Sequence, residues 1–227
     1  MMISAKPSVI LFDMDGTTVR HINPRWLHIL DRIDDAMFAI DRFINKKSHA
    51  TLPVSPSKQN SRLIVHRALH KIRRKPVEQI VEPCPGVREV LELARDIGIP
   101  MAVVSNGLGK GYGHDILEKF DLKQYFKAAI FREDFTLAKP HPQPLINALK
   151  AMNMDVSNTD TIWCIGDRRK DILAGLALET TLGCKVHSFS YGLQAAITIL
   201  EKHISTDHIL TTYHDLYTKL LPFKPAP

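Results

Sequence analysis

Two carboxylates, Asp13 and Asp15, follow directly after the apolar run at residues 9–12, and a glycine comes next. The run is short enough for one buried strand, and a strand that ends in Asp-x-Asp carries both acids at the carboxyl edge of a sheet. In open α/β folds, ligands bind at that edge. Because an unpaired buried charge is costly, packing alone gives no reason for two acids there. A simple turn at Asp15-Gly16 is the structural alternative.

Three later segments add polar side chains of the kinds that handle a charged substrate. In chain order they are Ser105 and Asn106 after the apolar run 101–104, Lys139 in a proline-rich loop, and Asp167 and Asp171 after the apolar run 161–165. Each has an ordinary explanation as a turn, a solvated loop lysine or the acidic first turn of a helix. Their occurrence together favours a shared chemical role.

This set of side chains suits phosphoryl transfer. A phosphate monoester is a dianion, so an attacking carboxylate meets like charge unless a divalent cation neutralises it. Mg²⁺ prefers hard oxygen ligands and keeps some of its waters, and Asp13, Asp167 and Asp171 could hold it if their strand ends are neighbours. A lysine adds a fixed positive charge for the developing negative oxygens. Attack by a carboxylate divides one difficult step into two.

In that order, the four segments resemble the four motifs of the haloacid dehalogenase-like (HAD) superfamily of phosphohydrolases, over residues 9–190. The resemblance implies a Mg²⁺-dependent phosphoric monoester hydrolase that acts on a small phosphorylated metabolite through an aspartyl-phosphate. It implies that Asp13 is the nucleophile and a metal ligand. Asp15 would protonate the leaving oxygen, then activate water, and would bind the metal through its backbone carbonyl.

The resemblance also implies roles for the remaining site residues. Ser105 and Lys139 would stabilise the transferred phosphoryl group, and Asn106 would help to bind the phosphate. Asp167 would bind the metal directly, and Asp171 directly or through water. Two alternatives stay open. A phosphomutase of the same superfamily shares both acids of the first motif, and a catalytically silent member would keep the fold as a binding protein.

The elements that must position these residues alternate between strands and helices, as in a doubly wound, Rossmann-like α/β core with a parallel sheet. After the first run at 9–12, the sequence predicts strands at 101–104, 128–131, 161–165 and 185–189. It predicts helices at 87–94, 114–120, 142–152, 171–178, 194–203 and 214–221.

One long segment interrupts this alternation. Apolar residues recur at helical spacing from Trp26 to Ile44. A loop with several prolines and serines follows at 51–60, and a second helical stretch covers 61–75. The segment therefore reads as helical, and it lies where the HAD subfamily that includes the phosphoglycolate phosphatases has a helical cap.

We predict two domains from this interruption: a core of residues 1–19 and 83–227, and an all-helical cap of residues 20–82 inserted after the first strand. The cap segment holds 13 Lys or Arg against 6 Asp or Glu, so the chain's excess of positive charge lies there. A basic cap would raise the local concentration of an anionic substrate. His21 and Arg25, just beyond the first motif, are candidates for binding the substrate near its leaving group.

Composition limits the remaining possibilities. The chain has 227 residues, a net charge of +6 and 44% hydrophobic residues, which is ordinary for a globular protein. No apolar run reaches the ~18 residues of a membrane span, and no signal-peptide pattern is present, so we expect no membrane insertion. Three cysteines without CxxC spacing favour reduced thiols and a cytoplasmic location. The basic run at 73–75 is too short to argue for nucleic acid, and a monomer or a dimer both stay open.

Overall fold

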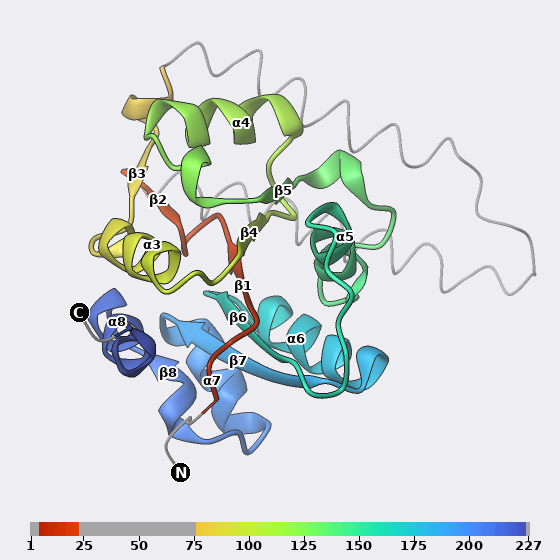
Figure 1. Cartoon of the computed structure of the whole chain (residues 1–227). Coiled ribbons are helices and arrows are strands. Elements are labelled where there is room, and N and C mark those ends of the chain that lie inside the picture. Colours follow the sequence, from red (N-terminus) through yellow and green to blue (C-terminus); the bar gives the residue numbers. More distant parts are fainter. Residues whose placement is uncertain (1–4, 23–75, 226–227) are drawn as a thin grey trace, which may run out of the picture. The chain divides into compact units, whose positions relative to one another are not determined.

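The computed structural model describes residues 5–22 and 76–225 (Figure 1). The chain divides into two compact units, one of residues 1–20 with 81–227 and the other of residues 21–80. The predicted cap of residues 20–82 falls almost wholly outside the described residues, so its helices and its boundaries stay predictions.

A six-stranded sheet organises the larger unit. Its strands follow the order β5-β4-β1-β6-β7-β8, and each neighbouring pair runs parallel. They are β1 (Val9–Asp13), β4 (Met101–Val104), β5 (Ala128–Ile130), β6 (Thr161–Gly166), β7 (Lys185–Tyr191) and β8 (Ile209–Leu210). A second, two-stranded sheet contains β2 (Val19–His21) and β3 (Val81–Pro83). The predicted α/β fold with a parallel sheet is confirmed.

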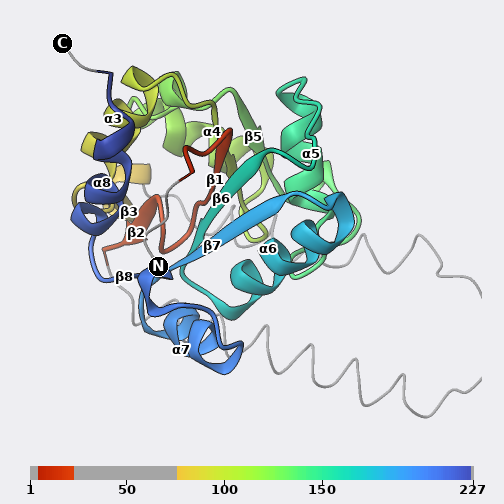
Figure 2. The ribbon, with the colours of Figure 1, turned by 60° about the horizontal axis from the view of Figure 1, so that its bottom comes forward.

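Helices cover both faces of the large sheet, with α3 and α8 on one side and α5 and α6 on the other (Figures 1 and 2). The helices are α3 (Val87–Asp96), α4 (Lys110–Lys119), α5 (Gln143–Ala151), α6 (Arg169–Leu182), α7 (Leu193–Glu201) and α8 (Tyr213–Leu220). None of these described helices has the length and apolar character that a membrane span requires.

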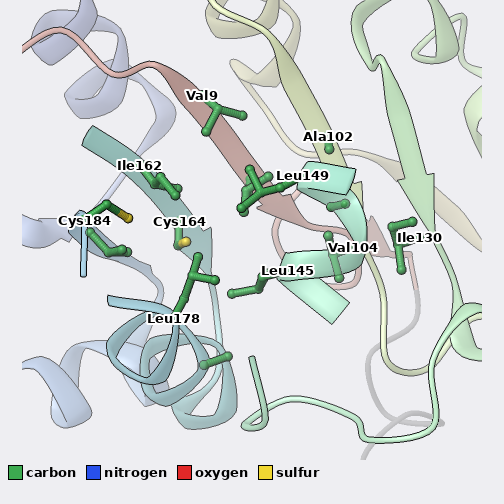
Figure 3. Packing of buried hydrophobic residues seen from close by; sticks show 14 of the residues in the cluster. Val9, Ala102, Val104, Ile130, Leu145, Leu149, Ile162, Cys164, Leu178 and Cys184 are labelled. Atoms are coloured by element: carbon green, nitrogen blue, oxygen red, sulfur yellow. The ribbon is translucent and has the colours of Figure 1, made fainter. Parts of the chain in front are cut away.

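Burial on both faces explains why the central strands β1, β4 and β6 are largely apolar runs in the sequence. Every residue of β1 is buried. Toward α5 and α6, Val9 and Leu11 of β1 belong to one apolar cluster with Val104 of β4, Cys164 of β6 and Leu145 of α5 (Figure 3). This packing holds the ends of β1, β4 and β6 in fixed positions relative to one another.

Two helices differ from the predictions by more than two residues at one end. Helix α4 begins at Lys110 rather than near residue 114. The prediction began too late because two glycines in the first turns of the helix weaken the helical pattern of the sequence. One of them, Gly113, lies where a Cβ would collide with the Phe131 ring. Helix α6 continues to Leu182, where Gly183 ends it in the left-handed conformation.

The connections place β1 at the point where the strand order changes direction. From β1 the chain goes to β4 and β5 on one side and then crosses to β6, β7 and β8 on the other. In doubly wound folds the crevice at such a point, beside the carboxyl ends of the strands, is where ligands bind. The ends of β1, β4 and β6 therefore define the region in which to look for a site.

Candidate active site

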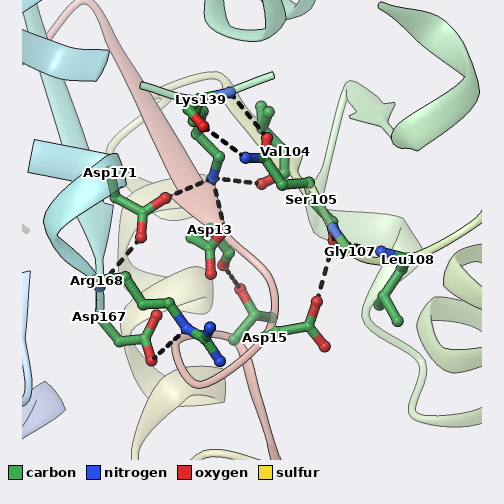
Figure 4. Close-up of polar contacts among 12 residues, drawn as sticks. Asp13, Asp15, Val104, Ser105, Gly107, Leu108, Lys139, Asp167, Arg168 and Asp171 are labelled. Carbon is green, nitrogen blue, oxygen red and sulfur yellow. Dashed lines mark hydrogen bonds and ion pairs between the residues drawn. The ribbon is translucent and has the colours of Figure 1, made fainter. Parts of the chain in front are cut away.

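The polar residues selected from the sequence come together at the carboxyl ends of β1, β4 and β6 (Figure 4). Asp13 is the last residue of β1, and Ser105 directly follows β4. Lys139 lies in the loop before α5, and Asp167 and Asp171 follow β6 at the start of α6. Residues 158 positions apart in the sequence thus share one small region because a parallel sheet gathers its strand ends at one edge.

Lys139 connects three of these strand ends. Its Nζ lies 2.5 Å from Asp13 Oδ1 and 2.7 Å from Asp171 Oδ1, and it donates to the Val104 carbonyl at 3.0 Å. The lysine side chain is 2% exposed. Burial lowers the pKa of Lys139, but the charges of Asp13 and Asp171 together raise it by more, so the pKa lies above its ordinary value. The lysine is therefore a fixed cation between two carboxylates.

Asp13 is held at both its side chain and its backbone. Burial and the nearby Asp171 raise the pKa of Asp13 to about 6, while Lys139 opposes the shift. The Thr18 hydroxyl donates to the Asp13 carbonyl at 2.7 Å. A buried carboxylate that remains ionised at neutral pH and is fixed in position can act as a nucleophile.

Ser105 orients the second acid of the first motif. Its Oγ accepts from the backbone N–H groups of Gly107 and Leu108, at 3.2 and 3.0 Å. The hydroxyl then donates to Asp15 Oδ2 at 3.1 Å. Asp15 is half-buried. Its carboxylate therefore has a fixed direction while it keeps access to solvent.

The tight loop of residues 14–19, which follows Asp13, lies against the end of β6. Gly16 has φ +83°, and a Cβ at this position would collide with the Asp167 carboxylate. The loop is closed by hydrogen bonds from Gly16 N to the Val19 carbonyl and from Thr18 N to the Met14 carbonyl, at 2.8 and 3.0 Å. Only glycine combines this backbone conformation with this close approach.

Three carboxylates form a group that suits a hard cation. Asp13, Asp167 and Asp171 each offer an oxygen, and these oxygens lie within 4.8 Å of one another. Asp167 Oδ1 is buried without a hydrogen-bond partner among the described residues. Burial, followed by the charges of Asp13 and Asp171, raises the pKa of Asp167 to about 8. An orphaned buried oxygen beside two further carboxylates fits Mg²⁺, which takes oxygen ligands from one or a few acids.

The remaining predicted site residues differ in what the structure says of them. Asn106 uses both ends of its amide on Lys139: Nδ2 donates to the Lys139 carbonyl at 2.9 Å, and Oδ1 accepts from the Lys139 N–H at 3.0 Å. These bonds hold the lysine's backbone, and the predicted phosphate contact of Asn106 stays a prediction. His21 ends β2, and Arg25 lies outside the described residues.

Sequence reasoning missed the supporting role of three residues: Gly16, which it considered only as a turn residue, Thr18 and Tyr213. The first two could have been found, because they directly follow the paired acids and a loop that turns back on itself needs such residues. The third lies about 200 residues away in α8. Its hydroxyl donates to the Thr17 carbonyl at 2.8 Å, and no local pattern in the sequence signals this contact.

Comparison with known proteins identifies relatives of this chain. A family model described as haloacid dehalogenase-like hydrolase matches residues 10–183. A phosphoglycolate phosphatase of Neisseria meningitidis is 28% identical over 156 residues, which are 68% of this chain and 63% of that protein. A pyrophosphatase PpaX of Halalkalibacterium halodurans is 23% identical over 92% of this chain and 94% of its own.

Solved structures share the fold at lower identity. A HAD hydrolase, family IA, variant 3, from Entamoeba histolytica superposes with a TM-score of 0.62 at 15% identity, covering 95% of this chain and 98% of its own. A HAD-superfamily hydrolase from Ehrlichia chaffeensis gives a TM-score of 0.59 at 20% identity, covering 96% and 98%. At these identities the likeness concerns the fold alone.

Proposed function

The chain belongs to the haloacid dehalogenase-like hydrolases, and we propose that this enzyme is a Mg²⁺-dependent phosphatase that hydrolyses a small phosphate monoester through an aspartyl-phosphate. The observation that carries the proposal is the Lys139 ammonium between Asp13 and Asp171, 2.5 and 2.7 Å away, beside the Ser105–Asp15 hydrogen bond. The names of the phosphatase and pyrophosphatase relatives support the same reaction class.

In the first step, a carboxylate oxygen of Asp13 attacks the phosphorus atom and the bond to the leaving oxygen breaks. Asp15 donates its proton to that oxygen, so the alcohol leaves as a neutral molecule. Lys139 and the Ser105 hydroxyl stabilise the negative charge on the phosphoryl oxygens. The product of the step is an acyl phosphate on Asp13.

In the second step, Asp15 is ionised and acts as the base. It removes a proton from a water molecule, whose oxygen attacks the phosphorus atom of the acyl phosphate. The bond between phosphorus and Asp13 breaks, inorganic phosphate leaves, and both acids return to their starting protonation states. One residue thus serves as acid and then as base, which requires the half-exposed position that Asp15 has.

We propose that Asp13, Asp167, Asp171 and the backbone carbonyl of Asp15 hold the metal. When bound, Mg²⁺ neutralises charge on the phosphoryl oxygens and lowers the repulsion between the substrate dianion and the attacking carboxylate. The orphaned oxygen of Asp167 supports this assignment, because a buried polar atom without a partner is costly in the metal-free protein.

Substrate choice is proposed to depend on residues beyond this cluster. Asp13, Lys139 and Ser105 contact only the phosphoryl group in the proposed mechanism, so they cannot distinguish one ester from another. We propose that the predicted cap, with His21 and Arg25 as candidates, contacts the leaving group.

The free, buried cysteines Cys84 and Cys164 agree with a reducing compartment, and we propose a cytoplasmic location.

The proposal predicts that Asp13→Asn abolishes turnover. The amide keeps the size of the side chain but removes the nucleophilic charge, so kcat should fall about 10⁴-fold or more. Hydrolysis of p-nitrophenyl phosphate in Mg²⁺ measures this, and mass spectrometry after acid quench should detect a phosphoryl adduct at Asp13 in the wild-type enzyme.

Asp115→Asn is the matched control, because Asp115 is exposed on α4 and should leave kcat unchanged. EDTA should stop the wild-type reaction, and Mg²⁺ should restore it. Turnover of Asp13→Asn at the wild-type rate would refute the nucleophile, and activity that persists in EDTA would refute the metal requirement.

A further inference from the structure

The C-terminal helix α8 reaches the loop that follows the first motif. Tyr213 is the first residue of α8, and it lies 30 residues beyond the segment that matches the family. Its side chain is 1% exposed. The hydroxyl donates to the Thr17 carbonyl at 2.8 Å in a buried hydrogen bond. A residue outside the matched segment therefore contacts the backbone two positions after Asp15.

The loop that accepts this hydrogen bond, residues 14–19, directly follows Asp13 and contains Asp15. Thr17 is fully buried, and the hydroxyl of its neighbour Thr18 donates to the Asp13 carbonyl. On the other side of Thr17, Gly16 N donates to the Val19 carbonyl. The position of the Thr17 peptide therefore affects both ends of the loop. Without the tyrosine hydroxyl, the buried Thr17 carbonyl would lose its donor, which favours movement of the loop toward water.

Tyr213 itself is held firmly by its surroundings. A Cβ at Gly86, where α3 begins, would lie 3.0 Å from the Tyr213 Cβ, so the two backbones pack closely. The rings of Tyr213 and Tyr191 have centroids 4.7 Å apart. At the start of α8, the Asp215 carboxylate accepts from the backbone N–H of Thr212. The phenol is thus part of a packed helix interface, which fixes the position of its hydroxyl beside the loop.

We propose that Tyr213 is a positioning residue of the active site: its hydroxyl fixes the Thr17 carbonyl and thereby holds the loop that aims Asp15 at the leaving group. The inference rests on the proposed function for its catalytic consequence. The structural part, that the hydroxyl restrains residues 14–19, stands on the Tyr213–Thr17 contact alone.

Tyr213→Phe tests the proposal because it removes the hydroxyl and keeps the ring. Backbone amides of residues 14–19 should exchange with deuterium roughly threefold to tenfold faster, as expected for loss of one neutral hydrogen bond. The kcat for glycerol phosphate, an alkyl ester that needs protonation, should fall by a similar factor. The kcat for p-nitrophenyl phosphate should change less than about twofold, because its leaving group needs little protonation.

Tyr217→Phe is the matched control: it makes the same change on the same helix, and neither exchange nor the ratio of the two kcat values should move. A variant with para-aminophenylalanine at position 213 keeps a donor and should restore both readouts. It also serves as the test if Tyr213→Phe does not fold. Unchanged exchange in Tyr213→Phe, or an equal loss for both esters, would overturn the proposal. Activity that survives in Asp13→Asn would instead refute the proposed function, and the exchange result would still decide whether Tyr213 holds the loop.

Discussion

Lys139 and Asp167 lie on opposite sides of Asp13 and Asp171 (Figure 4), and their charged groups have different surroundings. On the Lys139 side, the ammonium lies between the carboxylates of Asp13 and Asp171 and also donates to a backbone carbonyl. On the Asp167 side, one carboxylate oxygen is buried without a hydrogen-bond partner among the described residues. Arg168 Nε lies 3.9 Å from the other oxygen.

This difference separates a permanent charge from an exchangeable one. The lysine is a cation that the chain supplies, so the Lys139 side is organised before a substrate binds, and little reorganisation is needed during the reaction. The Asp167 side has an excess of acid, and burial together with the charges of Asp13 and Asp171 raises the pKa of Asp167. A cation from solution would balance that excess. The predictions below disturb first one side and then the other.

Lys139→Met should have the largest effect, because it removes the fixed cation and leaves two buried carboxylates without a counter-ion. We expect kcat to fall about 10³-fold, as for loss of a major electrostatic contact in the transition state. We also expect the free energy of unfolding to fall by about 3–5 kcal/mol, as when a buried ion pair loses one partner. Steady-state kinetics and urea unfolding measure the two effects.

Lys110→Met provides the control for this change. Lys110 pairs with Asp134 at 3.1 Å, but its side chain is 58% exposed, and exposed pairs contribute at most about 1 kcal/mol. If the two variants lost the same stability, the Lys139 side would not be the buried, organised part of the site that we describe.

Asp15→Asn tests the half-exposed acid that faces the leaving group. Loss of proton transfer should lower kcat for an alkyl phosphate about 10²-fold or more. An aryl phosphate with a good leaving group should lose far less in the first step. KM should change little, because an amide keeps the backbone carbonyl that we assign to the metal. Equal losses across leaving groups, measured over a series of substituted phenyl phosphates, would show that Asp15 is not the general acid.

The sequence predicted the strands of the site because their burial is nearly complete. The runs at 9–12, 101–104 and 162–165 are apolar on both faces. Asp13 and Ser105 directly follow the first two, and Asp167 follows the third after Gly166. In a parallel sheet, strand ends meet at one edge, so sequence order was enough to predict that Asp13, Ser105 and Asp167 lie close together. Lys139 lies in a loop, where no strand pattern indicates its position, so its prediction depended on the order of all four motifs.

The contacts that hold the site could not be predicted in the same way. The bond between Tyr213 and Thr17 joins residues 196 positions apart, and its existence depends on how α8 packs against α3. The two hydrogen bonds of Asn106 to Lys139 join two loops, whose conformations are set by neither periodicity nor propensity. Short elements such as β8 have too few residues for a pattern, so only tertiary packing determines them.

Mg²⁺ binding should depend on pH, and this is the smallest and sharpest test of the Asp167 side. In the metal-free protein the pKa of Asp167 is raised to about 8 and that of Asp13 to about 6. Protons on these acids must leave when the cation binds. The apparent affinity should therefore rise about tenfold per pH unit between pH 6 and 8 and level off above pH 8. Isothermal titration calorimetry in two buffers of different ionisation enthalpy measures both the affinity and the protons released.

The same shift gives a signed prediction for stability. An acid whose pKa is higher in the folded state than its ordinary 3.8 binds its proton more tightly when folded. The unfolding free energy of the metal-free protein should therefore decrease as pH rises from about 4 to 8, and Mg²⁺ should restore it. Asp167→Asn should weaken Mg²⁺ binding and remove most of the dependence of that binding on pH between pH 6 and 8. If wild-type affinity were constant over that range, Asp167 would be ionised without the metal, and the contrast with the Lys139 side would not exist.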